Sequence, residues 1–344
     1  MDDAPAPMCF KDVETDRQSE FKRTSGYFSP EAQADGVYLR SVRPGRVMPV
    51  PYCVPVPHSP ENIFFEIREQ ALAYFASRDI EWHDQTPGRK PSNHLRDSQV
   101  CCVNCLFPFA TRPDALADLL RPVFPTLQRM LPIDGDDRYL AFEWISTQDY
   151  LHDSLPGLPR RRGKGCTSSD SAVLFEVQGG QREAALLDWK YTETCDGKPL
   201  HVSPAGRDRV AIYRPFFDHS DCPFNKAVVK GFDDLFYAPF DQLMRLQFLA
   251  HEMERAEEFG VKRVTVVHIT PAANAQAATV TSPVLRTLGK TAIDVWRQIV
   301  RLPDRFVAVP TEDLFGAFPL RKYKNLESWW TYITARYSWI MPKS

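Results

Sequence analysis

Residues 171–191 read SAVLFEVQGGQREAALLDWKY, two apolar runs joined by a pair of glycines. Side chains alternate over Ser171 to Gln178 and again over Ala184 to Tyr191, which is typical of β-strands. Gly179-Gly180-Gln181 between them is a turn signal. We therefore expect an antiparallel hairpin at the centre of the fold.

An acid and a lysine share one face of the second strand of this hairpin. Asp188 and Lys190 are two residues apart, so their side chains point the same way, whereas Leu187 and Trp189 point the other way. Burial of such charges costs free energy unless they are paired or bound to something. The hairpin would also bring Asp170, near the start of the preceding strand, alongside them.

This set of side chains suits the hydrolysis of a phosphodiester. Two carboxylates can hold Mg²⁺ through oxygen atoms, and the metal activates a bound water. Asp170 and Asp188 are the candidate ligands, the carbonyl of Trp189 is a further candidate oxygen, and Mn²⁺ should substitute. Lys190 would position the water or stabilise negative charge. The spacing alone leaves open an ordinary salt bridge between Asp188 and Lys190.

The pattern around the hairpin predicts further strands and helices of an α/β sandwich with a mixed sheet. Helical spacing and capping residues predict helices over residues 59–77, 113–130, 238–258, 282–300 and 325–340. Short apolar runs predict strands over residues 138–146, 261–270 and 305–309. A strand reached through the long helix over 238–258 favours a parallel crossover.

The density of proline residues indicates that the chain has two parts. Residues 1–57 are proline-rich and predict an extended arm. Residues 58–344 predict a single domain, with a catalytic core over about 90–275 and a helical elaboration over about 280–344. Cys102 and Cys105 form a CxxC that lacks a second ligand pair for zinc, so buried thiols are expected.

The overall charge gives no support to nucleic-acid binding. The formal net charge is −2, so any attraction for phosphate must be local. The densest basic run is Arg160-Arg161-Arg162-Gly163-Lys164. No apolar run reaches the length of a membrane span and the N-terminus lacks a secretory pattern, so we expect a cytoplasmic protein.

Several runs together resemble the PD-(D/E)XK nuclease superfamily, and more narrowly the PGN_0703-like restriction endonucleases. The runs span about residues 90–255 and are Asn93–Gln99, Tyr150–Asp153, Arg162-Gly163, Thr167–Val173, Asp188–Glu193 and Pro239–Arg245. The resemblance implies a restriction-endonuclease-like core, a central mixed sheet flanked by helices, and a metal-dependent nuclease acting on DNA. Asp188 stands where that family usually has glutamate, and Asp153 stands where it has the acid of a Leu-Gly-Glu sequence.

The resemblance also implies helpers around the central three residues. An upstream acid that completes the metal site is either Asp153, which matches the family position, or Glu143, which lies in an apolar strand. Gln242 opens the long helix and would face the metal site. Arg245, three residues on, could contact a phosphate. Glu193 is a helper or a structural acid.

Further residues are candidates for contacts with nucleic acid, each with a structural alternative as a cap, turn or solvated loop. These candidates are Arg160, Arg161, Arg162, Lys164, Ser169, Asn93, Gln99 and Arg245. His268, on the apolar strand over 261–270, is expected to be a hydrogen-bonded core histidine. The aromatic residues near the C-terminus have helical spacing, which favours core packing over base stacking.

The sequence supports three functional hypotheses. The leading one is a Mg²⁺-dependent DNA endonuclease in restriction or anti-phage defence, acting as a homodimer or with a defence-system partner. The second is an interbacterial nuclease toxin or a repair nuclease. The third, from another class, is a catalytically silent subunit that binds nucleic acid or serves as a scaffold.

Overall fold

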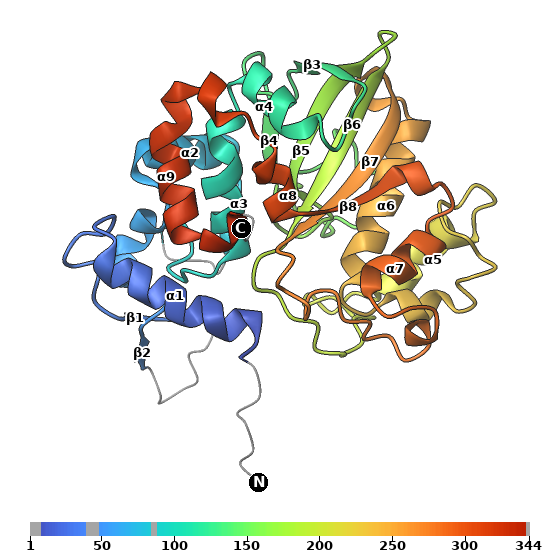
Figure 1. The fold of residues 1–344 in the computed structure, drawn as a ribbon. Coiled ribbons are helices and arrows are strands. Elements are labelled where there is room, and N and C mark those ends of the chain that lie inside the picture. The colour runs from blue at the N-terminus through green and yellow to red at the C-terminus, as the bar shows by residue number, and fades with distance from the viewer. Residues whose placement is uncertain (1–7, 39–47, 84–87, 342–344) are drawn as a thin grey trace.

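A six-stranded mixed sheet lies at the centre of the computed structural model, which describes residues 8–38, 48–83 and 88–341 (Figure 1). Its strand order is β3-β5-β6-β7-β8, with β4 also paired to β5. The strands β3 to β6 are antiparallel neighbours, whereas β6, β7 and β8 run parallel. The predicted α/β core with a mixed sheet flanked by helices is therefore confirmed. The strands of the described residues are β1 (Gly36–Val37), β2 (Pro49–Val50), β3 (Leu127–Leu131), β4 (Leu140–Trp144), β5 (Ser169–Val177), β6 (Arg182–Trp189), β7 (Val261–Thr270) and β8 (Phe306–Pro310).

The predicted hairpin is formed by β5 and β6. Gly179 and Gly180 join the two strands with φ of 99° and 78°, a backbone region that glycine adopts without steric cost. The amide of Val177 donates to the carbonyl of Gln181 at 2.9 Å and closes the turn. The turn fixes the register of the two strands, and with it the side chains that face each other across the hairpin.

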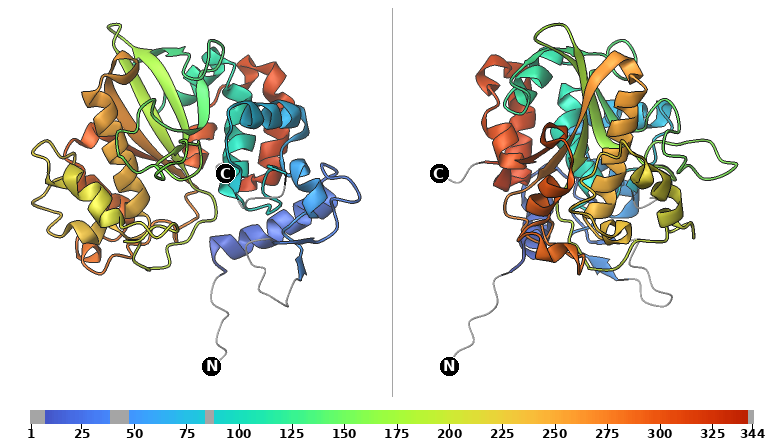
Figure 2. Two further views of the ribbon diagram at one scale, coloured as in Figure 1. Left: turned by 180° about the vertical axis from the view of Figure 1, so that it is seen from behind. Right: turned by 90° about the vertical axis from the view of Figure 1, so that its right-hand side faces the viewer.

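Helices cover both faces of the sheet. The α-helices of the described residues are α1 (Phe10–Thr24), α2 (Phe65–Ser77), α3 (Ser98–Leu106), α4 (Pro113–Leu120), α5 (Arg209–Asp218), α6 (Phe240–Arg255), α7 (Ala292–Ile299), α8 (Thr311–Gly316) and α9 (Glu327–Arg336). Two apolar cores result, one on each face. In the right-hand view of Figure 2, α9 lies on one side of the strands, whereas α5 and α6 lie on the other. Within the described residues, none of the helices is long and apolar enough to cross a membrane.

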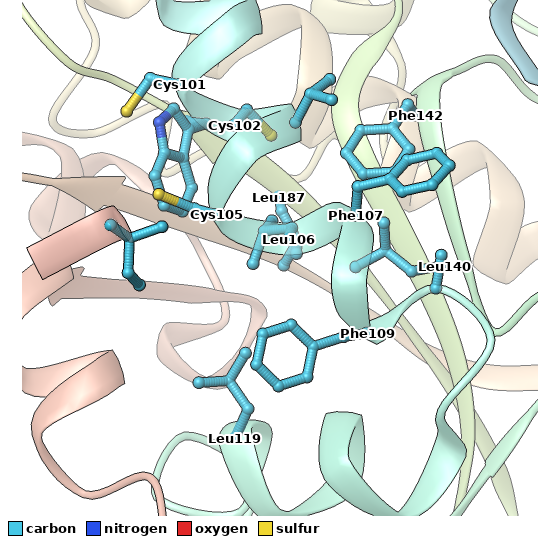
Figure 3. Close-up of a cluster of buried hydrophobic side chains, with 14 of the residues drawn as sticks. Cys101, Cys102, Cys105, Leu106, Phe107, Phe109, Leu119, Leu140, Phe142 and Leu187 are labelled. Atoms are coloured by element: carbon cyan, nitrogen blue, oxygen red, sulfur yellow. The ribbon is translucent and has the colours of Figure 1, made fainter. Parts of the chain in front are cut away.

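The alternation of β6 places its side chains in the two different cores. Leu187 and Trp189 pack into the core shared with α2, α3 and α9, whereas Leu186 packs into the core under α6. Figure 3 shows Leu187 with the cysteines of α3 and with Leu140 and Phe142 of β4. The predicted buried thiols of Cys102 and Cys105 lie in this core.

The N-terminal segment differs from the predicted extended arm. Within residues 1–57, α1 is a 15-residue helix whose inner face is buried. Gln18 on that face exchanges hydrogen bonds with Arg336 of α9, at 3.0 Å in each direction. The sequence does not predict this helix, because most of its buried residues are polar and form no apolar stripe. The buried polar residues are Glu14, Gln18, Ser19 and Lys22. Residues 1–7 and 39–47 of the predicted arm lie outside the described residues.

All five predicted helices are shorter than their patterns indicated, and the helix over 238–258 loses only its ends as α6. The helix over 113–130 is wrong in its second half, where Pro122 and Pro125 end α4 and the chain turns into β3. The helix over 282–300 begins only at Ala292, with the side chain of Thr291 as its cap. Those over 59–77 and 325–340 are interrupted by 3-10 turns, at residues 56–62 before α2 and 338–340 after α9.

Candidate active site

The hairpin register places the side chains of Asp170 and Asp188 side by side on one face of the sheet. Ser171 pairs with Leu187, so the next pair along the strands is Asp170 with Asp188. Lys190 follows two residues after Asp188 and points to the same face. The three residues singled out in the sequence are therefore neighbours on the α6 side of the sheet.

Neighbouring strands extend this pair to a row of four titratable side chains. The parallel pairing of β6 with β7 sets His268 beside Asp188. β4 pairs with β5 on either side of Glu143, which places Glu143 opposite Asp170. The row therefore runs Glu143, Asp170, Asp188, His268 across four adjacent strands.

Asp188 is held by two cationic or polar partners. One carboxylate oxygen accepts from Nζ of Lys190 at 2.6 Å, and the other lies 2.6 Å from Nδ1 of His268. The side chain is 1% exposed. Burial would raise the pKa of Asp188, but Lys190 and His268 outweigh burial and lower it below its usual range. Asp188 is therefore an anion with a fixed orientation.

Lys190 connects Asp188 with helix α6. Its ammonium donates to Asp188 and, at 2.8 Å, to Oε1 of Gln242 in the first turn of α6. Burial opposes the charge of Lys190, but Asp188, Asp170 and Glu193 raise its pKa above the ordinary value. The lysine is a positioned cation at the wall of the site.

Asp170 faces a different electrostatic environment from that of Asp188. One of its oxygens accepts from the backbone amide of Trp189 at 2.6 Å. Burial, together with the negative charges of Asp188 and Glu143, raises the pKa of Asp170 to about 7 despite the opposing effect of Lys190. Strong perturbation of this kind is frequent at functional sites, because ligands or substrates supply the missing charge.

Glu143 reaches the row through an unusual backbone conformation. Its φ is 45°, in the left-handed region that is uncommon for residues other than glycine. Its carboxylate is almost fully buried and accepts from Nε2 of Gln99 at 2.7 Å and from Oγ of Ser168 at 3.3 Å. A Cβ at Gly163 would lie 3.2 Å from this carboxylate, so the glycine leaves it room.

A cavity of about 390 Å³ opens beside the row. Glu143, Asp170 and Lys190 contribute to its wall from the sheet, and Gln242 and Arg245 contribute from α6. Asp188 lies beneath this wall and is 0% exposed. The cavity is large enough for a phosphodiester group with parts of its nucleosides.

Asp153, the alternative upstream acid, occupies a different position. Its carboxylate accepts from the amide of Thr167 at 2.9 Å and from the hydroxyl of Tyr213 at 2.8 Å. It lines a second cavity, of about 340 Å³, next to the first. The structure thus groups Glu143, and not Asp153, with Asp170 and Asp188.

Arg162 of the basic run belongs to the interior. Its guanidinium forms an ion pair with Asp134 at 2.7 Å and donates to the hydroxyl of Tyr74 at 2.9 Å. Only 12% of the side chain is exposed. Arg160 is also partly buried and donates to the carbonyl of Ser146. Arg161 and Lys164 are more exposed, and they pair with Asp79 and Glu81.

Of the polar residues predicted to contact nucleic acid, one supports the candidate site and two are buried structural residues. Gln99 supports the carboxylate of Glu143, as described above. Asn93 is 0% exposed and donates to the carbonyls of Val37 and Val54 at 2.9 and 2.8 Å, so it secures the N-terminal segment. Ser169 is also 0% exposed and donates to a strand carbonyl. A nucleic-acid backbone does not reach Asn93 or Ser169 in this arrangement.

His268 and Ser168 were not among the predicted site residues. The buried, hydrogen-bonded histidine is confirmed, but its partner is Asp188, which the sequence does not reveal because the two strands are linked by α5 and α6. The available signal in the sequence was a polar side chain within an apolar strand. Ser168 stood within the quoted small polar run.

The donor set is compatible with a divalent metal ion. Asp170 and Glu143 line one cavity with carboxylate oxygens, the ligands that Mg²⁺ prefers. Across residues 8–38, 48–83 and 88–341, no three Asp, Glu, His or Cys side chains form a ready-made metal cluster. Mg²⁺ commonly uses one or two carboxylates and takes its other oxygens from water and substrate phosphates. The residues therefore fit a magnesium ion whose coordination water and a substrate would complete.

Comparison with protein families identifies a relationship over most of the chain. A family model described as Restriction Endonuclease associating with ARP matches residues 16–338. The match includes the whole row from Glu143 to His268. No curated protein and no solved structure matches the chain.

Proposed function

This chain belongs to the family Restriction Endonuclease associating with ARP, and from that premise we propose that it is a Mg²⁺-dependent DNA endonuclease of the PD-(D/E)XK type. Membership of a restriction-endonuclease family implies a hydrolase that acts as a nuclease. The metal, the DNA substrate and the roles of individual residues are our proposal.

The observation that carries the proposal is the placement of Lys190. Its ammonium is fixed between Asp188 and Gln242 at 2.6 and 2.8 Å, and it lines the same cavity as Asp170. A salt bridge with a purely structural role needs neither a cavity nor a second polar partner. A cation held beside an acid with a raised pKa is the arrangement that stabilises a phosphoryl group during attack by water.

Each side chain then has a role. Asp170 and Glu143 would hold the metal, with Asp188 available once its lysine turns to the substrate. A bound Mg²⁺ would lower the pKa of a water and polarise the phosphoryl oxygen. Lys190 would orient the attacking water and stabilise charge on the phosphoryl oxygens, while Gln242 and His268 hold Lys190 and Asp188 in place.

The family name also points to a biological setting. It describes restriction endonucleases that associate with ARP, and we propose that this chain acts in defence together with such a partner. Pull-down of the tagged full-length protein with ARP tests the association, and equal recovery with an unrelated tagged protein would contradict it.

One observation favours a second candidate, a silent subunit that binds nucleic acid without cutting it. Both oxygens of Asp188 are engaged by Lys190 and His268, and the side chain lies beneath the cavity wall. If these contacts persist with substrate, Asp188 cannot serve as a metal ligand. DNA binding without cleavage under Mg²⁺ or Mn²⁺ would support this candidate.

The test is cleavage of plasmid DNA with Mg²⁺, and separately with Mn²⁺, by the wild type and by two variants. Asp170→Asn and Lys190→Ala should each lower the rate at least about 100-fold, the usual effect of losing a metal ligand or a charge-stabilising donor. Asp16→Asn and Lys324→Ala, at exposed positions, are the matched controls. Wild-type rates for both site variants would overturn the assignment.

A further inference from the structure

Three cavities lie in series on the α6 side of the sheet. The first contains the candidate active site, and the second shares Cys166 and Arg245 with it. The third, of about 240 Å³, shares Leu155, Lys164 and Gly165 with the second. The long loops that precede β5 and α5 lie on this side of the sheet (Figure 2). Their shared wall residues place the three cavities side by side, with the second and third farther along from Asp170.

The second cavity is rich in positive charge, in contrast to the whole chain. Four cations line it, from different parts of the chain, against the single carboxylate of Asp153. That carboxylate is occupied by the amide of Thr167 and the hydroxyl of Tyr213, both neutral donors. The four cations are Lys164, Arg207, Arg209 and Arg245.

The positive charges around this cavity outnumber the carboxylates that neutralise them. Arg209 and Arg245 share one carboxylate, that of Asp241, at 3.0 and 3.3 Å. Lys164 pairs with Glu81 at 3.2 Å. Four cations therefore face three carboxylates, those of Asp153, Asp241 and Glu81, which leaves one net positive charge (4 − 3 = 1).

Arg207 carries this excess in a fixed position. Its guanidinium donates to the backbone carbonyls of His152, Asp153 and Ser154, the last at 2.9 Å. In the part of the chain that the structure describes, it has no carboxylate within ion-pair distance. Carbonyl groups orient a guanidinium without neutralising it, so an anionic ligand would gain the full charge of a positioned donor.

We propose that the second cavity binds a phosphodiester of the substrate strand next to the one that is cleaved, with Arg207 as its principal ligand. This inference rests on the proposed nuclease function. The shared wall favours a phosphate that belongs to the same strand as the scissile one, because Arg245 borders both cavities. A free phosphate acting as an effector would present the same chemistry, and the test separates the two.

Binding of a labelled DNA oligonucleotide without divalent metal provides the first readout. Arg207→Gln should weaken binding about tenfold at low salt and reduce the slope of log K against log salt by about 1. Arg207→Lys keeps the charge and should keep most of the slope. Arg321→Gln removes an exposed arginine elsewhere and serves as the matched control. Equal affinity and slope for Arg207→Gln and Arg321→Gln would overturn the proposal.

Cleavage of two substrates provides the second readout. Bis(p-nitrophenyl) phosphate carries a single phosphate and would occupy the first cavity alone, so Arg207→Gln should hydrolyse it at the wild-type rate. The same variant should cleave the oligonucleotide about tenfold more slowly at subsaturating concentration. Equal losses on both substrates would overturn the proposal, because Arg207 would then serve the first cavity or the fold.

Inorganic phosphate distinguishes a strand phosphate from a free effector. If phosphate changes the hydrolysis of bis(p-nitrophenyl) phosphate by the wild type but not by Arg207→Gln, the second cavity holds a free anion and the proposal fails. If phosphate only competes with the oligonucleotide for binding, the proposal stands. A wild type that binds DNA with the expected slope but cleaves nothing would refute the proposed function while supporting the phosphate site.

Discussion

Glu143 shows how a single backbone conformation decides which acid faces the cavity of the candidate site. A residue in regular β-conformation between Phe142 and Trp144 would follow the alternation of the strand. The φ of 45° departs from that pattern and presents the carboxylate to Gln99, Ser168 and the cavity. Such a conformation costs on the order of 1–3 kcal/mol and is kept where the surroundings enforce it, often at functional sites.

Replacement of the two candidate acids separates their roles. Glu143→Gln should lower cleavage at least about tenfold and shift the Mg²⁺ dependence to higher concentration, because one anionic ligand is lost. Asp153→Asn should instead destabilise the fold by about 1–3 kcal/mol, because its buried oxygens accept hydrogen bonds from Thr167 and Tyr213. Titration of cleavage with Mg²⁺ and urea unfolding measure both effects. The reverse pattern would restore Asp153 as the upstream acid.

The raised pKa of Asp170 should make the stability of the metal-free protein depend on pH. Its pKa of about 7 in the folded state lies above the ordinary value of 3.8, so the native state keeps a proton that the unfolded chain releases. The stability that this proton supplies is complete below about pH 4 and is lost as the pH rises towards 7. Urea unfolding in EDTA between about pH 5 and 8 should show this fall, and Asp170→Asn should flatten it. An equal slope in the variant would contradict the shift.

Among the elements, α1 and α9 are joined by a buried arginine. Arg336 is 0% exposed and donates to Gln18 of α1 and to the carbonyls of Asn62 and Leu95. These acceptors come from three separate segments. The guanidinium therefore secures the N-terminal helix, the segment before α2 and the segment before α3 to the C-terminal helix.

Arg336→Met should lower the free energy of unfolding by about 3 kcal/mol, because several buried acceptors would lose their donor at once. Arg121→Met, at an exposed position after α4, should change it by no more than about 0.5 kcal/mol. Urea unfolding of both variants provides the measurement. Similar stabilities for the two would show that the Arg336 contacts contribute little.

Some elements could be read from the sequence and others could not. The strand predicted over residues 261–270 coincides with β7, because its apolar run has clear ends at Gly260 and Pro271. The predicted helix over 113–130 merged α4 with β3, because residues 127–131 continue the apolar spacing of the helix. The chain between residues 192 and 237 carries α5 but shows little periodicity. Local pattern predicts an element where an apolar run has clear ends, and fails where tertiary pairing decides.

In the whole molecule, some residues of the candidate site can be predicted from local sequence and others only from tertiary pairing. Asp170, Asp188 and Lys190 could be placed together because they belong to one hairpin, whose geometry depends on local sequence. The sequence cannot decide between Glu143 and Asp153, because the proximity of Glu143 to Asp170 depends on the pairing of β4 with β5 and on its own φ. His268 comes to the site, and Arg207 to the neighbouring cavity, through long connections, which no spacing along the chain can reveal.

A metal bound at the sheet should stabilise the entire fold by mass action. Asp170 and Glu143 repel each other in the metal-free protein, and Mg²⁺ at about 100 times its Kd would add roughly 2.7 kcal/mol. The Tm of the wild type should therefore rise by several degrees with Mg²⁺, while Asp170→Asn should respond much less. Differential scanning calorimetry with and without EDTA is the measurement. An equal rise in wild type and Asp170→Asn would place the ion elsewhere.

The contacts of Glu14 bear on how the protein is made in the cell. The carboxylate of Glu14 accepts from the hydroxyl of Tyr191, next to Lys190, and from the indole of Trp339, which follows 325 residues later. At a synthesis rate of 5–20 residues per second, Trp339 emerges from the ribosome roughly 15–65 seconds after Glu14. Trp339 also packs on the ring of Tyr191, so the strand end that carries Lys190 gains the support of Trp339 only late in translation. An incomplete nascent chain would therefore lack the C-terminal contacts that hold this end of the candidate site.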